Sequence, residues 1–158
     1  MTEIRFENVT DTEKPFTVHY RVKVPGYAEK TGKRMFFQPG YFSRNSQPLF
    51  STSNRKYQVY FKYPWAEQDE VTIELPEGFE LEGAENPASL PIKQVGEYTM
   101  SCDINADKKL VYKRDFRFGE NNNVLFPVDA YAQIKRIFDF IHKNDTHIVT
   151  LRDAALNE

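Results

Sequence analysis

The chain has 158 residues, of which 40% are hydrophobic, 15% aromatic and 28% charged, and these values indicate one globular domain that is long enough to bury a core. Its 21 basic and 23 acidic residues give a formal net charge of −2 and are spread along the sequence, which argues against a nucleic-acid or anionic-lipid surface. No apolar run approaches the roughly 20 residues that a membrane-spanning helix needs, so that class is excluded.

The first half of the chain has the alternation of antiparallel strands. A short strand is predicted at 4–9, and the clearest alternation follows it, with an apolar residue at every second position from Phe16 to Val24. This period of two predicts a strand with one buried face. Residues 41–55 have no period and form the longest candidate loop. Further strands are predicted at 34–38, 56–65, 70–75 and 79–81.

A β-hairpin is predicted in the second half. Residues 98–104 and 110–118 both alternate, and the polar residues between them supply the turn. Residues 83–91 are expected to form a connecting loop, and 147–151 a last short strand. Several short strands without alternating helices favour a mostly β fold, namely an antiparallel β-sandwich of the immunoglobulin or fibronectin type, as one domain over residues 1–158.

One amphipathic helix is expected near the C-terminus, over about 127–144. Its apolar stripe recurs at spacings of three, four and three and consists of Tyr131, Ile134, Phe138 and Ile141. Pro127 suits the first turn of a helix, and Lys143 suits the last turn because of the helix dipole. A lone amphipathic helix does not stay folded, so we expect its stripe to pack on the sandwich.

A cysteine nucleophile or a metal site has little support in the sequence. Cys102 is the only cysteine, which excludes an internal disulfide and a cysteine zinc cluster. It lies in an alternating strand, where a buried structural thiol is favoured over a catalytic one. The histidines lack the short spacings of zinc ligands, and they are His19, His142 and His147. We therefore expect no catalytic residue, no metal and no cofactor.

Two local groups of carboxylates are interpreted as solvated charge in turns. Glycoside chemistry needs carboxylates from separated elements that face one cleft, which neighbouring residues in a sequence do not establish. The groups are Glu67, Asp69 and Glu70, and Glu80, Glu82 and Glu85.

Aromatic side chains are the one feature that points to a binding surface. Phe36 and Phe37 are adjacent, as are Tyr60 and Phe61, so the rings of each pair point to opposite faces of a strand. Either a second sheet, the helix or a loop covers both faces, or some rings form a partner interface or a sugar-stacking surface. For the second case, the expected glycan or peptide surface consists of Phe42, Phe50 and Trp65.

A set of short motifs runs along nearly the whole chain. They are Lys14-Pro15, Phe37-Gln38-Pro39, the strand from Arg55 to Tyr63 with Pro64, Leu75-Pro76-Glu77-Gly78-Phe79, Tyr112-Lys113-Arg114, Pro127-Val128-Asp129-Ala130-Tyr131 and Ile148-Val149-Thr150-Leu151-Arg152. This pattern resembles the C-terminal domain, itself of unknown function, of bacterial transglutaminase-like proteins. In those longer proteins, an N-terminal domain of unknown function and a transglutaminase-like, papain-like cysteine core come first.

The resemblance implies a non-catalytic role for this chain. The catalytic Cys, His and Asp of such proteins belong to the upstream core, and no residue here matches them, Cys102 included. It also implies that the chain is a fragment of a longer exported, extracytoplasmic protein, which agrees with the lack of a secretory signal at Met1. The expected function is an accessory domain that packs against the core in the same polypeptide, or against a partner. The alternative is a glycan- or peptide-binding sandwich.

Overall fold

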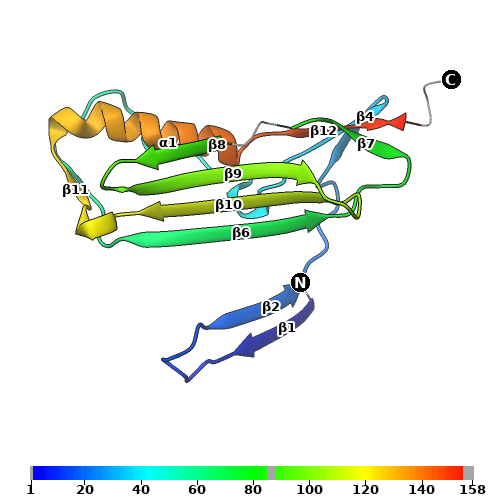
Figure 1. Cartoon of the computed structure of the whole chain (residues 1–158), viewed down its shortest axis with the longest axis horizontal. Coiled ribbons are helices and arrows are strands. Elements are labelled where there is room, and N and C mark those ends of the chain that lie inside the picture. Colours follow the sequence, from blue (N-terminus) through cyan, green and yellow to red (C-terminus); the bar gives the residue numbers. More distant parts are fainter. Residues whose placement is uncertain (1, 85–87, 155–158) are drawn as a thin grey trace.

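The computed structural model describes residues 2–84 and 88–154. Within these residues, the strands form two four-stranded and two two-stranded antiparallel sheets, and there is one α-helix, near the C-terminus (Figure 1). The predictions of a mostly β chain, antiparallel pairing and one C-terminal helix are therefore confirmed. No helix of the described residues is long and apolar enough to cross a membrane.

The long sheet has the strand order β6, β10, β9, β8. Its strands are β6 (Trp65–Ile73), β8 (Ala88–Ile92), β9 (Gly96–Ile104) and β10 (Leu110–Phe118). The predicted hairpin is confirmed as β9 and β10, with Cys102 opposite Tyr112. The apolar side chains of both strands point to one buried face, as the period of two requires.

Two boundaries of the long sheet differ from the sequence-based expectation. Strand β6 begins at Trp65, whereas a strand was expected only from residue 70, because the polar run Glu67 to Glu70 hides the alternation. Strand β8 occupies part of the segment 83–91 that was predicted to be a loop. It is an edge strand, and among the described strands its one neighbour is β9, so little of its sequence has to be apolar.

The helix α1 (Tyr131–Asp145) packs on the buried face of the long sheet (Figure 1). A single 3₁₀ turn, Val128–Ala130, precedes it, so the predicted helix is confirmed except for its first turn. The four predicted anchors are all buried, and they are Tyr131, Ile134, Phe138 and Ile141. The apolar stripe thus identified the packing face correctly.

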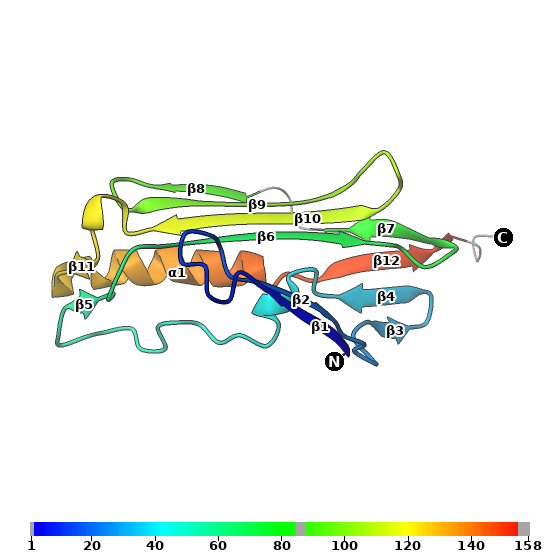
Figure 2. The same cartoon turned by 90° about the horizontal axis from the view of Figure 1, so that it is seen from below.

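The short sheet has the strand order β3, β4, β12, β7 and shares the core of the long sheet. Its strands are β3 (Glu29–Thr31), β4 (Arg34–Phe37), β7 (Phe79–Gly83) and β12 (Val149–Asp153). Figure 2 shows α1 and β12 following one another along the long sheet. The helix and the short sheet therefore cover the two ends of one apolar face, and a plain immunoglobulin-like sandwich stays a prediction.

The remaining small elements lie around the loop that follows β4. The segment 41–55 contains only a 3₁₀ turn, Tyr41–Ser43, as expected for the longest loop. The strand predicted at 56–65 is reduced to β5 (Val59–Tyr60), which pairs with β11 (Leu125–Phe126). A further 3₁₀ turn, Glu120–Asn122, occupies the polar turn after β10.

The N-terminal ribbon consists of β1 (Thr2–Glu7) and β2 (Thr17–Arg21), which pair with each other and with no other described strand. It projects from the rest of the chain (Figure 1). The sequence correctly predicts a strand here, but the expectation of a buried face is wrong. The apolar residues from Phe16 to Val22 are all exposed, because no other described element covers them.

Candidate functional site

The candidate site is an apolar surface that begins on the N-terminal ribbon. The register places Phe6 opposite Val18, and the rings of Phe6 and Phe16 stack with their centroids 6.0 Å apart. The whole apolar face, in which every side chain is at least 39% exposed, consists of Ile4, Phe6, Phe16, Val18, Tyr20 and Val22. An isolated two-stranded ribbon is marginally stable in water, so this face is suited to contact with another apolar surface.

The opposite face of the ribbon is polar and pairs its own charges. Glu7 accepts from Arg5 at 2.8 Å and lies 3.3 Å from His19 Nε2, while Arg21 pairs with Glu3 at 3.2 Å. All these side chains are exposed, so each pair contributes little to stability. The ribbon is therefore amphipathic, with one apolar and one charged face, both of them exposed.

An apolar cleft of about 460 Å³ continues this surface into the body of the chain. It lies where β2 leads to the short sheet, next to the end of β6. Its apolar lining includes Val22, Val24, Met35, Val71, Ile73 and Leu75. The one acidic or basic residue among the described lining residues is Glu74, which Lys109 pairs with at 2.7 Å. Val22 belongs both to the ribbon face and to the cleft, so the two form one surface.

A charge network centred on the buried Arg114 links the long sheet to α1. The Arg114 side chain, 7% exposed, donates from Nε to Asp145 at 2.8 Å and from Nη1 to Glu67 at 2.9 Å, and lies 3.3 Å from Asp69. The Tyr98 hydroxyl donates to the same Asp145 oxygen at 2.8 Å. These contacts join β6, β9 and β10 to the end of α1.

The protonation states of this network follow from burial and pairing. Burial alone would lower the pKa of Arg114, but the hydrogen bonds and negative charges of Asp145 and Glu67 outweigh it and raise that pKa above its usual value. Burial, reinforced by Asp145, also raises the pKa of Tyr98. The guanidinium is therefore charged and the phenol neutral at all ordinary pH values, as a structural network requires.

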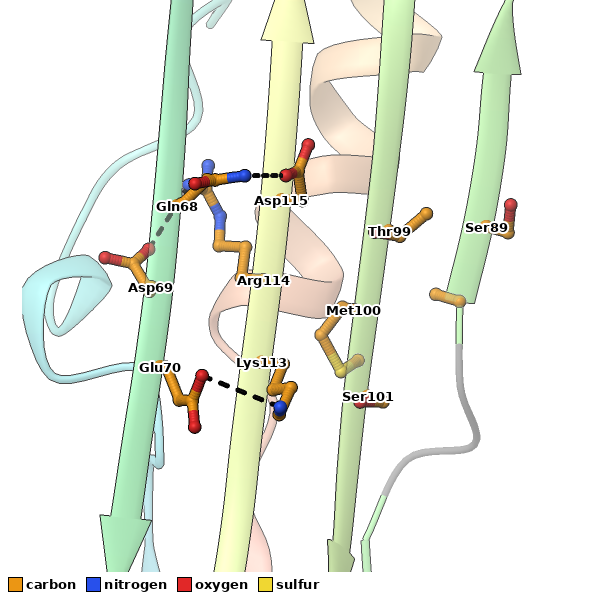
Figure 3. Close-up of a pocket in the computed structure, with 11 residues that line it drawn as sticks. Gln68, Asp69, Glu70, Ser89, Thr99, Met100, Ser101, Lys113, Arg114 and Asp115 are labelled. Atoms are coloured by element: carbon orange, nitrogen blue, oxygen red, sulfur yellow. Dashed lines mark hydrogen bonds and ion pairs between the residues drawn. The ribbon is translucent and has the colours of Figure 1, made fainter.

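The first acidic group thus differs from the expectation of solvated charge in a turn. Its residues lie on β6, where Glu67 and Asp69 face Arg114 on the buried side. Glu70 pairs with Lys113 at 3.5 Å on the outer side (Figure 3). In the second group, Glu82 pairs with Arg34 through two hydrogen bonds. Glu85 of that group lies outside the described residues.

The outer face of the long sheet carries a polar groove of about 680 Å³ (Figure 3). Its side chains pair with one another across neighbouring strands, as Gln68 does with Asp115 and Glu70 with Lys113. Because these four side chains already pair with one another, they offer a ligand fewer free hydrogen-bonding positions.

Cys102 lies in the core, as the sequence predicts. It is 4% exposed, and burial raises the pKa of its thiol to about 11, so the nucleophilic thiolate is scarce at neutral pH. Among the described residues, no histidine hydrogen-bonds this sulfur, and no three or more His, Cys, Asp or Glu side chains are arranged to hold a metal ion.

The three histidines occupy separate environments. His19 lies on the polar face of the ribbon, and His142 near the end of α1 lies 3.4 Å from the Ser46 hydroxyl. His147 is buried, and its Nδ1 donates to the Asn144 carbonyl at 2.7 Å. These contacts are those of cap and core residues.

The structure does not bring Phe42, Phe50 and Trp65 together on one surface. Phe50 is buried, and its ring packs against Tyr131 with centroids 5.5 Å apart. Trp65 is half-buried against Phe118. Phe42 is exposed, and among the described residues no ring contact links it to the other two. Sequence reasoning missed the ribbon face and the apolar cleft, although the strong alternation from Phe16 to Val24 was the available signal.

Comparison with known proteins gives a family for this chain. A family model described as a domain of unknown function with solved-structure structure (DUF3858) matches residues 33–151. No curated protein and no solved structure matches the chain. The matched span includes the long sheet, α1 and most of the short sheet. The ribbon precedes it.

Proposed function

The chain belongs to the DUF3858 family, and we propose that it is a non-catalytic accessory domain that docks through its ribbon. The apolar face of the ribbon and the apolar cleft together form the docking surface. Its partner is the catalytic core of a transglutaminase-like protein, which lies upstream in the same polypeptide. The single observation that carries the proposal is the exposure of Ile4, Phe6, Phe16, Val18, Tyr20 and Val22 on one face.

The energetics of this surface support docking. Covering each aliphatic or aromatic side chain is worth roughly 1.5–3 kcal/mol when burial is complete, so several of them together can offset the cost of association. The centres of protein interfaces are apolar and poor in charge. The apolar cleft has this character, since Glu74 is the one charged side chain among its described lining residues.

The choice of a transglutaminase-like core rests on the resemblance of the sequence motifs. Tethering within one polypeptide supplies an effective concentration in the millimolar range. A docking surface of moderate affinity is therefore sufficient, which suits a ribbon whose polar face remains solvated. The parent protein works outside the cytoplasm in this proposal, as the resemblance implies.

The same proposal gives the domain no catalytic step of its own. The buried, protonated thiol of Cys102 supports this assignment. We also propose that the two four-stranded sheets are the two halves of an immunoglobulin-like sandwich. The single core that they share supports this proposal.

We predict that Val18→Asp weakens binding to the separately produced transglutaminase-like core roughly tenfold or more, because it places a charge in an apolar interface. Titration calorimetry measures the effect. Val128→Asp is the matched control, since the two valines are 40% and 44% exposed and Val128 lies outside the docking surface. Binding that is absent in the unmodified chain, or equally affected by both substitutions, would contradict the proposal.

A further inference from the structure

A second cleft, at the start of β6, has the chemistry of a sugar site. It has a volume of about 570 Å³ and combines aromatic rings with one acidic and one basic side chain. The residues that matter here are Tyr60, Lys62, Tyr63, Trp65 and Glu67. We propose that this tyrosine cleft binds a neutral oligosaccharide.

The two tyrosine rings of the tyrosine cleft are free to contact a ligand, whereas the ring of Trp65 is held by the core. Tyr60 and Tyr63 are 64% and 66% exposed, and neither makes a ring contact within the described chain. Trp65 is fixed instead, since its ring lies 4.7 Å from that of Phe118 and 5.5 Å from that of Phe61, centroid to centroid. A rigid indole beside two accessible phenols is a suitable platform for the C–H face of a sugar ring.

The polar side chains of the tyrosine cleft can hydrogen-bond to the hydroxyl groups of a sugar. Glu67 is held in place because its Oε2 accepts from the buried Arg114 at 2.9 Å, yet its side chain is 52% exposed. A carboxylate fixed in this way can accept hydrogen bonds from a ligand with little further loss of side-chain freedom. Lys62 supplies donors of the opposite charge in the same lining. The lining therefore offers both an acceptor and a donor, which favours a ligand whose groups both donate and accept, such as the hydroxyl groups of a neutral sugar.

A proline-rich peptide is the other ligand that aromatic grooves commonly take. Proline has no N–H group, so it has no donor for the Glu67 oxygens, and an apolar peptide would desolvate the charge of Lys62 without compensation. A saccharide presents hydroxyl groups to both. The chemistry of the lining therefore favours the saccharide.

The tyrosine cleft is separate from the proposed docking surface. No described residue lines both this cleft and the apolar cleft, and the ribbon contributes none of its lining. Sugar binding and docking are therefore independent, and either can fail in experiment without the other.

The test begins with the unmodified chain on an array of neutral oligosaccharides and continues with a fluorescence titration of the strongest one. Trp65 is the only tryptophan, so its emission reports directly on the cleft. We expect a saturable shift, weakened roughly tenfold or more in Tyr63→Ala because a stacking surface is lost.

Tyr57→Ala is the matched control, because Tyr57 is 79% exposed in the same segment but does not line the cleft. It should leave the affinity unchanged, and equal melting temperatures should show that both variants fold. Three results would overturn the proposal: no saturable binding on the array, equal effects of the two substitutions, or binding of a polyproline peptide with no response to any oligosaccharide.

Discussion

Replacing Arg114 with methionine should lower the free energy of unfolding by about 3–5 kcal/mol, because it leaves the buried carboxylate of Asp145 without its cation. The guanidinium donates to Asp145 at 2.8 Å and to Glu67 at 2.9 Å from a side chain that is only 7% exposed. Urea denaturation followed by circular dichroism measures the loss.

Arg117→Met is the matched control on the same strand. Arg117 points to the outer face of β10 and pairs with Glu97 at 2.8 Å, where both side chains are about half exposed, so its removal should cost no more than about 1 kcal/mol. Adding Asp145→Asn to Arg114→Met should recover part of the stability, since it removes the unpaired charge. Equal losses for the two methionine variants would mean that the network is not structural.

Phe138→Ala should also lower the free energy of unfolding by about 3–5 kcal/mol, because it opens a cavity between α1 and the long sheet. The Phe138 ring lies 5.3 Å from that of Phe118 and 5.5 Å from that of Phe61, centroid to centroid. It is 8% exposed. Thermal and urea unfolding both measure this effect.

Phe140→Ala, two residues along the same helix, separates packing from helix propensity. Its ring is 36% exposed and contacts only that of Tyr98 within the described chain, so we expect a loss of less than about 1.5 kcal/mol. A loss at Phe138 no greater than that at Phe140 would show that α1 is not anchored through its apolar stripe.

The elements predicted well are those whose pattern is local. The stripe of α1 repeats over three turns, and the β9–β10 hairpin alternates on both sides of a short turn between Ile104 and Leu110, so each contains its own evidence. Strand β8 was missed because an edge strand needs few apolar residues. The sequence also does not reveal that the helix and the short sheet share one face of the long sheet, because this depends on contacts between distant segments.

The buried network illustrates what a local pattern cannot supply. Arg114 stands at one of the alternate positions of β10 whose side chains point into the core. A charged residue at such a position indicates that a charge is buried. The partner of Arg114, Asp145, is 31 residues away, at the end of α1, and no spacing rule connects the two. The same limit applies to the ribbon, because alternation predicts an apolar face but does not identify the molecule that covers it.

Aromatic composition indicated a surface but not which rings form it. Phe50 is drawn into the core by Tyr131 and Phe138, whereas Tyr60 and Tyr63 remain exposed. The difference arises from which loop residues α1 covers, and that is set by the fold as a whole.

Amide hydrogen exchange of the ribbon, with and without the transglutaminase-like core, tests the docking proposal most directly. The exposed hydrogen bonds of an uncovered two-stranded ribbon should exchange rapidly in the free chain. At a saturating concentration of the transglutaminase-like core, we predict that amide exchange in β1 and β2 slows markedly and that Val18→Asp reduces this protection. Unchanged exchange in β1 and β2 at saturation, with protection confined to other elements, would contradict the proposal.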